Sequence, residues 1–207
     1  MRLYFLRHGE STANLLREFS NSGWKHPLTE KGIEQAHAAA GGLAGVRVGR
    51  VYSSPVQRAV QTAQIVAEGL CAPLEVTEAL REWSVGIYEG TTDPAGWDLH
   101  RQIQDDWFVH GKLDSRMPGG ESFLDIRERF APFIEGLLRS GGNDERSLVL
   151  VGHGGLYIAM LPAIFVNIDW AFARQQGFPN TAYVLAETRP SGLYCLSWCG
   201  VPLDPSP

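Results

Sequence analysis

Two segments of the sequence place a histidine directly after an apolar run. Residues 3–9 read Leu-Tyr-Phe-Leu-Arg-His-Gly, and residues 147–154 read Ser-Leu-Val-Leu-Val-Gly-His-Gly. Apolar runs of this length are typical of buried β-strands, so each histidine should stand at the carboxyl end of a strand. Open α/β sheets bind their ligands at that edge. Arg7, His8 and His153 are therefore candidates for a reactive site at one edge of a sheet.

A third segment adds a second arginine to this edge. Residues 48–53 are predicted to form a strand, and Arg58 lies one turn into the following helix, which Pro55 is expected to open at its first position. Guanidinium groups match the oxygens of phosphate, and an imidazole can act as a covalent nucleophile. Two histidines and two arginines around one point therefore indicate a site for a phosphoryl group.

The turn after His8 carries three small polar side chains, Ser11, Thr12 and Asn14. Hydroxyl and amide groups in this place suit two roles, which are contact with an anion and capping of a helix that starts there. Taken alone, this segment could also be an ordinary strand and turn with an incidental histidine.

The composition describes one domain without a basic surface. The chain has 207 residues, of which 44% are hydrophobic, and this is enough for one sizeable core. The formal net charge is −5, so nucleic acid is not an expected partner. The apolar run before Arg7 is too short for a signal peptide, and no stretch approaches a membrane span. We therefore expect a cytoplasmic protein without membrane contact. The three cysteines show neither a metal spacing nor a disulfide framework.

Strands that alternate with helices predict an α/β fold with a sheet covered on both faces. The expected strands are residues 3–6, 48–53, 74–77, 147–152, 181–188 and 193–198. The expected helices are residues 29–43, 55–66, 121–138 and 156–166. Thr29 is the expected N-cap of the first helix, and Gly141 and Gly142 are expected to end the third.

Residues 80–120 show little periodicity and are too long for an ordinary connection. We expect this segment to be partly helical and to cover the mouth of the site like a lid. Its tryptophans, Trp83, Trp97 and Trp107, are expected to pack in the interior more than to contact a substrate. Residues 1–200 should form a single domain, and residues 201–207 should be a loose, proline-rich tail.

Six short motifs occur in order between residue 3 and about residue 156. They are Leu6-Arg7-His8-Gly9-Glu10 with Asn14, Ser53-Ser54-Pro55-x-x-Arg58-Ala59-x-Gln61-Thr62-Ala63, Leu80-x-Glu82, Gly86-x-x-Glu89-Gly90, Gly119-Gly120-Glu121-Ser122 and Val151-Gly152-His153-Gly154-Gly155. Each motif is weak alone, but their order and spacing together resemble the histidine phosphatase superfamily, also called the phosphoglycerate-mutase-like family. The resemblance implies a three-layer α/β/α sandwich with a mostly parallel central sheet.

The resemblance also implies a reaction and the residues that perform it. His8 would attack phosphorus and become a phosphohistidine. Arg7, Arg58 and His153 would hold the phosphoryl oxygens and stabilise the charge of the transition state. Glu82 would protonate the leaving oxygen and then activate the water that frees His8. The family needs no metal and no organic cofactor.

Further contacts with the substrate are expected from Asn14, Ser11, Thr12 and Gly154. The role of general acid has a second candidate, because Glu89 lies seven residues beyond Glu82. The position of Glu82 two residues after Leu80 resembles the phosphatase members of the family and favours Glu82.

The sequence departs from the mutase branch of the family at two places. Mutases carry a Trp just before the Asn of the first motif, where this chain has Ala13, and a Glu-Arg-His-Tyr-Gly sequence, where this chain has Glu82-Trp83-Ser84-Val85-Gly86. Lys25 also replaces an Asp that many members carry two residues before Pro-Leu-Thr, a position that is usually structural. The chain therefore resembles the phosphatase branch.

The function implied is that of a phosphomonoesterase acting on a small phosphorylated metabolite, such as a phosphosugar, a phosphoglycerate, phosphoserine or a ribazole phosphate. A phosphoglycerate mutase with the same phosphohistidine is the alternative. A non-enzymatic phosphate-binding module is disfavoured because every catalytic residue type is present. A two-histidine metal hydrolase is disfavoured because the usual carboxylate cluster is missing. The sequence leaves the oligomeric state open, with a homodimer as one alternative.

Overall fold

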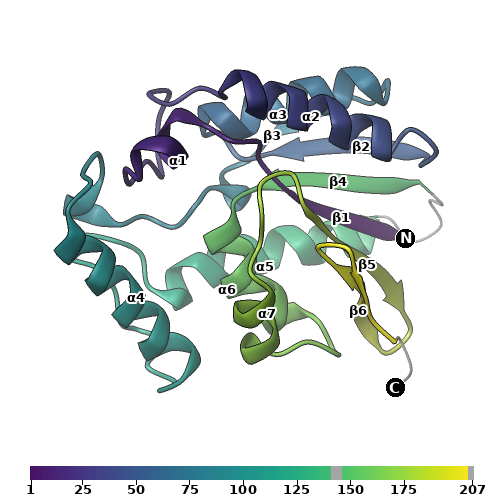
Figure 1. The fold of residues 1–207 in the computed structure, drawn as a ribbon. Coiled ribbons are helices and arrows are strands. Elements are labelled where there is room, and N and C mark those ends of the chain that lie inside the picture. Colours follow the sequence, from purple (N-terminus) through teal and green to yellow (C-terminus); the bar gives the residue numbers. More distant parts are fainter. Residues whose placement is uncertain (141–145, 205–207) are drawn as a thin grey trace.

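The computed structural model describes residues 1–140 and 146–204, which form a seven-stranded sheet between two layers of helices (Figure 1). The strand order is β3-β2-β4-β1-β5-β6-β7, in which β1 to β4 are parallel and β5 to β7 are antiparallel. The three-layer α/β/α fold predicted from the sequence is confirmed. The sheet is mixed, because an antiparallel extension adjoins its parallel half. The strands are β1 (Arg2–Arg7), β2 (Val48–Ser53), β3 (Leu74–Val76), β4 (Ser147–Gly152), β5 (Tyr183–Arg189), β6 (Gly192–Trp198) and β7 (Val201–Pro202).

Helices α2 and α3 cover one face of the sheet, and α5, α6 and α7 lie on the other (Figure 1). As predicted, Thr29 caps α2, since its side chain accepts a hydrogen bond from the backbone N–H of Gly32 at 3.0 Å. The helices are α1 (Thr12–Leu16), α2 (Glu30–Gly42), α3 (Gln57–Gly69), α4 (Pro94–Phe108), α5 (Phe123–Ser140), α6 (Gly154–Ile164) and α7 (Trp170–Gln176), with short 3-10 helices η1 (Glu78–Leu80) and η2 (Gly86–Tyr88). Within the described residues, no helix is both long and apolar enough to cross a lipid bilayer.

The central strand β1 contributes to a separate core on each face of the sheet. Leu3 and Phe5 pack in the core that contains residues of α5 and α6, whereas Tyr4 and Leu6 pack in the core beside α2 and α3. Successive side chains of a strand point to opposite faces, so a continuous apolar run is what a strand buried on both sides requires. This burial fixes Arg7 at the carboxyl end of β1.

The segment of residues 80–120 holds η2 and the fifteen-residue helix α4, which stands beyond the carboxyl ends of the parallel strands (Figure 1). Asp93 caps α4, since its carboxylate accepts a hydrogen bond from the backbone N–H of Ala95 at 3.0 Å. Trp83 and Trp107 are buried, with ring centroids 4.9 Å apart, which agrees with the packing role predicted for them. Trp97 differs, because it stacks on Phe19 and also lines the pocket. The helix is therefore anchored to the domain by aromatic packing.

Two predicted boundaries are wrong. Helix α3 begins at Gln57 and not at Pro55, because Ser54 still pairs with β4 through a 2.9 Å hydrogen bond from its N–H to the carbonyl oxygen of Val151. The tail is not loose at its start, because β7 pairs with β6 through a tight turn at Cys199 and Gly200. Both turn residues have positive φ, 49° and 89°, as a two-residue type I′ hairpin requires. The expected helix end at Gly141 and Gly142 and the end of the tail at 205–207 lie outside the described residues.

Candidate active site

His8 follows β1 directly and is almost completely buried, with 2% of its surface exposed. Its Nδ1 lies 2.7 Å from the carbonyl oxygen of Gly9, which can only accept, so Nδ1 carries the proton. The other nitrogen, Nε2, therefore keeps its lone pair. A side chain at Gly9 would place Cβ 2.4 Å from the carbonyl oxygen of Gly32, so glycine is required at this turn. The backbone after β1 thus fixes both the position and the tautomer of His8.

Arg58 lies in the first turn of α3 and joins the groups that the sequence predicted to meet. Its Nε donates to His8 Nε2 at 2.9 Å, and its Nη2 donates to His153 Nδ1 at 3.3 Å. Its Nη1 donates to the carbonyl oxygen of Ser20 at 2.6 Å. The centroids of the two histidine rings are 5.1 Å apart. Arg58 therefore sits at the centre of a compact, buried group of nitrogen donors and acceptors.

His153 is fully buried at the N-cap of α6. A guanidinium only donates hydrogen bonds, so the Nδ1 of His153 accepts from Arg58, and its Nε2 donates to the hydroxyl of Ser54 at 2.8 Å. Ser54 follows β2, and His153 follows β4, the next strand in the sheet. The edge of the parallel sheet thus brings these side chains together.

Arg7 is the last residue of β1, and not all of its hydrogen-bond donors have a partner within the described residues. Its Nη1 donates to the carbonyl oxygen of Phe178 at 2.5 Å, but its buried Nε has no partner within the described residues. A buried donor without a partner costs about 1–3 kcal/mol. An anion bound beside Arg7 would accept a hydrogen bond from this donor and remove the cost.

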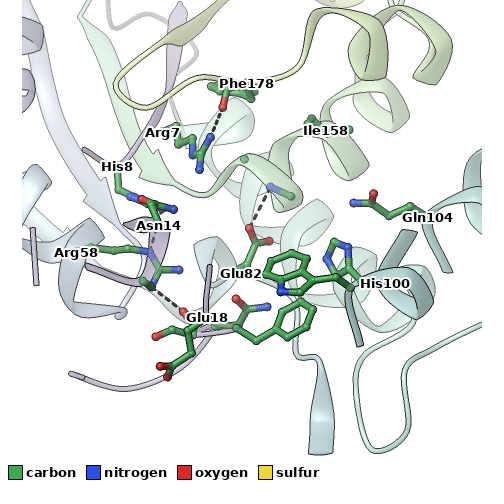
Figure 2. A pocket seen from close by; sticks show the side chains of 17 residues that line it. Arg7, His8, Asn14, Glu18, Arg58, Glu82, His100, Gln104, Ile158 and Phe178 are labelled. Atoms are coloured by element: carbon green, nitrogen blue, oxygen red, sulfur yellow. Dashed lines mark hydrogen bonds between the residues drawn. The ribbon is translucent and has the colours of Figure 1, made fainter. Parts of the chain in front are cut away.

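Glu82 is recessed in the same pocket, between the His8–Arg58 side and the opposite wall (Figure 2). Its carboxylate accepts hydrogen bonds from the backbone N–H groups of Trp83, at 3.1 Å, and Gly155, at 3.0 Å. Burial raises the pKa of Glu82, against the opposing effects of these hydrogen bonds and of the arginines. A carboxyl group with a raised pKa suits an acid that donates a proton near neutral pH.

The same burial keeps both histidines neutral. Desolvation lowers the pKa of His8 and of His153 well below the ordinary value of 6.5, and the charge of Arg58 lowers both further. Burial also lowers the pKa of Arg58, to about 10, so the guanidinium remains charged at neutral pH. A neutral imidazole beside a charged arginine is the state that a nucleophilic histidine needs, because the Nε2 lone pair stays available.

Ser11 and Thr12 do not line the pocket, contrary to the expected phosphate contact. The hydroxyl of Ser11 is buried and donates to Asn14 Oδ1 at 3.1 Å, and that of Thr12 lies 3.0 Å from His26 Nδ1. Helix α1 begins at Thr12 with Ser11 as its N-cap, and Ser11 and Asn14 form a capping box, so the capping alternative is correct for Ser11. Asn14 does line the pocket, and its amide NH₂ group is the donor that remains, since Oδ1 is occupied by Ser11.

The pocket around these groups has a volume of about 280 Å³. Of the predicted residues, the structure brings Arg7, His8, Asn14, Arg58, Glu82 and Gly154 together as its lining. His153, predicted to contact the phosphoryl group, is not among the lining residues, and its two ring nitrogens bind Arg58 and Ser54. Sequence reasoning missed the part of the lining that comes from the loop after α1, from α4 and from later segments, namely Glu18, Phe19, Ser20, Asn21, Trp97, His100, Gln104, Gly155, Ile158 and Phe178.

Glu89, the competing acid, lies outside this lining. Its carboxylate accepts hydrogen bonds from the backbone N–H groups of Asn21, at 3.0 Å, and Ser22, at 3.2 Å. The neighbouring carbonyl of Ser20 is the group that holds Arg58. Glu89 therefore acts on the site from outside the pocket, through the backbone of this loop and through its charge, which raises the pKa of Arg58.

The described residues contain no group of three or more His, Cys, Asp or Glu side chains arranged to hold a metal ion. The predicted residues that line the pocket instead supply two guanidiniums, a neutral imidazole, an amide and one carboxyl. This set can bind a dianion, attack it and exchange a proton with it.

Comparison with known proteins agrees with this chemistry. The profile of the histidine phosphatase superfamily (branch 1) matches residues 3–200. The chain is 29% identical to glucosyl-3-phosphoglycerate phosphatase of Mycolicibacterium vanbaalenii, over 92% of this chain and 87% of that protein. It is 28% identical to a probable phosphoglycerate mutase of Salmonella choleraesuis, over 84% and 79% of the two chains. The structure of mycobacterial glucosyl-3-phosphoglycerate phosphatase with VO3 superposes with a TM-score of 0.81 at 28% identity, covering 95% of this chain and 98% of that one. The chain therefore belongs to branch 1 of the histidine phosphatase superfamily.

Proposed function

We propose that this protein is a metal-independent phosphomonoesterase that hydrolyses a small phosphorylated metabolite, with His8 as the nucleophile. The main support for this proposal is the environment of His8 Nε2. This nitrogen is unprotonated and accepts a 2.9 Å hydrogen bond from Arg58. Arginine, histidine and a proton-donating carboxyl then surround the same point. The family match and the phosphatase among the relatives support this assignment.

In the first step, His8 Nε2 attacks phosphorus while the bond from phosphorus to the alcohol oxygen breaks. Glu82 delivers its proton to that oxygen, so the alcohol leaves neutral and Glu82 becomes a carboxylate. Arg58 exchanges its hydrogen bond with Nε2 for one with a phosphoryl oxygen. The unpaired donors of Arg7 bind a second oxygen, and this fixed positive charge stabilises the transition state.

In the second step, water attacks the phosphohistidine. The Glu82 carboxylate accepts a proton from this water, the bond between phosphorus and Nε2 breaks, and inorganic phosphate leaves. The Asn14 amide supplies a neutral donor to the phosphoryl group. His153 holds Arg58 in place from behind, through the contact with its Nη2.

The direct test of this function measures whether the phosphoryl group of the phosphohistidine is transferred to water or returned to the alcohol product. In a buffer with a strong chelator, the purified protein should release phosphate from phenyl phosphate and from a panel of phosphorylated metabolites. With 3-phosphoglycerate and a bisphosphoglycerate primer, any turnover should yield more phosphate than 2-phosphoglycerate. Isomerisation that exceeds hydrolysis by a wide margin would show that the mutase alternative is correct, and activity that requires added zinc or magnesium would exclude the metal-independent mechanism.

The pH profile of kcat/KM should show an acid-side optimum. Activity needs Glu82 protonated, so it should fall as pH rises through the raised pKa of this group. It also needs His8 neutral, and because burial lowers the pKa of His8, activity should persist below pH 6.5, where an ordinary histidine takes up a proton. The pH profiles of wild type and Glu82→Gln should be measured on one substrate, because a titration that belongs to the substrate appears in both proteins. The fall of kcat/KM at alkaline pH should vanish in the variant. A wild-type profile that falls on acidification through pH 6.5, beyond the fall that protonation of the substrate phosphate itself causes, would contradict the neutral His8.

A cytoplasmic location and a homodimer stay predictions of this proposal, as does the absence of a nucleic-acid partner.

A further inference from the structure

One face of α4 forms the wall of the pocket opposite the phosphoryl site. Trp97, His100 and Gln104 follow one another at spacings of three and four residues, which places them on the same face of the helix, and all three line the pocket. Figure 2 shows His100 and Gln104 across the pocket from His8 and Arg58. A phosphate held at His8 would therefore direct its alcohol group towards this face of α4.

The polar groups on this face are neutral and unoccupied. The ring of His100 stacks on Trp83, with centroids 4.4 Å apart and planes inclined by 20°. Burial lowers the pKa of His100 to about 4, with a smaller effect from Arg101, so its imidazole is uncharged at neutral pH. Within the described residues, neither His100 nor Gln104 has a hydrogen-bond partner in the protein. Each presents both a donor and an acceptor to whatever occupies the pocket.

The cations of the pocket lining are confined to the phosphoryl end, where Arg7 and Arg58 lie. The arginine of α4 closest in sequence to this wall, Arg101, pairs with Asp98, and its side chain is 61% exposed. The lining also includes the carboxylate of Glu18, which pairs with Lys25 and His26. A carboxylate on the alcohol part of a substrate would thus meet neutral groups and the carboxylate of Glu18, and the lining residues supply no cation beyond Arg7 and Arg58.

We infer that the substrate is the phosphate ester of an uncharged alcohol rich in hydroxyl groups, such as a sugar or polyol, whose hydroxyls bind His100 and Gln104. Hydroxyl groups match neutral donors and acceptors, whereas a carboxylate would lose its water without gaining a positive partner. The inference rests on the proposed phosphatase function and selects one substrate class within it. Trp97 and Ile158 add apolar surface beside these two groups for the carbon skeleton.

Glycerol 3-phosphate and 3-phosphoglycerate test this inference directly, because they share a carbon skeleton and differ in a hydroxymethyl group against a carboxylate. Wild type should hydrolyse glycerol 3-phosphate with a kcat/KM at least about tenfold higher, the factor expected from one hydrogen bond gained or lost. Equal values or a preference for 3-phosphoglycerate would overturn the inference and leave the phosphatase function standing. Failure to release phosphate from either ester and from phenyl phosphate would overturn both.

A positive charge added to the face of α4 that lines the pocket should change the preference between glycerol 3-phosphate and 3-phosphoglycerate. Gln104→Arg should raise the ratio of kcat/KM for 3-phosphoglycerate over glycerol 3-phosphate by about tenfold or more, because the new cation meets the carboxylate. Gln104→Leu should lower kcat/KM for glycerol 3-phosphate more than for phenyl phosphate, which has no hydroxyl to bind. Gln102→Arg is the matched control, since Gln102 lies on the exposed side of the same helix. A Gln104→Arg ratio that equals the Gln102→Arg ratio, with both variants folded by thermal unfolding, would contradict the assignment of this wall.

Discussion

Replacement of His8 by alanine is expected to lower turnover of every phosphate ester by roughly six orders of magnitude, the loss that removal of a covalent nucleophile causes. The substitution removes the atom that attacks phosphorus, and Arg58, which donates to that atom at 2.9 Å, cannot replace it. Steady-state release of inorganic phosphate measures the loss. His37→Ala is the matched control, because His37 is exposed on α2 and lies outside the pocket.

The His8→Ala protein should still fold and bind anions. Arg7 keeps its contact with Phe178, and Arg58 keeps its contacts with Ser20 and His153. Vanadate or phosphate should therefore still raise the thermal unfolding temperature of the variant, although turnover is lost. A folded His8→Ala protein with more than about a tenth of wild-type turnover would rule out a covalent role for this residue.

Replacement of Glu82 by glutamine is expected to slow an alkyl phosphate by roughly two to four orders of magnitude, the usual contribution of a general acid. An alkoxide is a strong base and needs the proton that glutamine cannot give, whereas a nitrophenolate leaves without help. The same variant should therefore affect phosphorylation of His8 by a nitrophenyl ester much less. Pre-steady-state release of the alcohol separates this step from the hydrolysis that follows.

Glu89→Gln distinguishes the two candidate acids. Glu89 binds the backbone N–H groups of Asn21 and Ser22 and lies outside the pocket lining, so its loss should lower activity on alkyl and aryl esters by similar factors. If Glu89→Gln shows the dependence on leaving group and Glu82→Gln does not, the proton comes from Glu89 and the assignment of Glu82 is wrong.

The catalytic half of the pocket could be predicted from sequence because short-range signals specify it. The apolar run of β1 identifies a buried strand, and Arg7 is its last residue. Arg58 follows β2 at the same edge, so the topology of a parallel sheet brings it to His8. Thr29 caps α2 through a local hydrogen bond that residue type alone suggests.

The substrate half of the pocket could not be predicted in the same way. His100 and Gln104 lie on α4, whose position depends on aromatic packing between residues far apart in sequence, such as Trp83 and Trp107. No spacing in residues 80–120 indicates which face of this helix meets the site. Ser11 was a candidate for two roles, because its residue type suits both capping and contact with an anion. Only the three-dimensional arrangement shows that it caps α1.

The central claim is that His8 carries the phosphoryl group, and trapping that intermediate tests it most directly. Wild type mixed with a nitrophenyl phosphate and quenched within milliseconds into alkaline denaturant should give a peptide that contains His8 and is heavier by one phosphoryl group. Fragmentation should place the group on the His8 imidazole, and His8→Ala should show none. A phosphoryl group found on His153, or rapid turnover with no phosphorylated histidine at any quench time, would contradict the account.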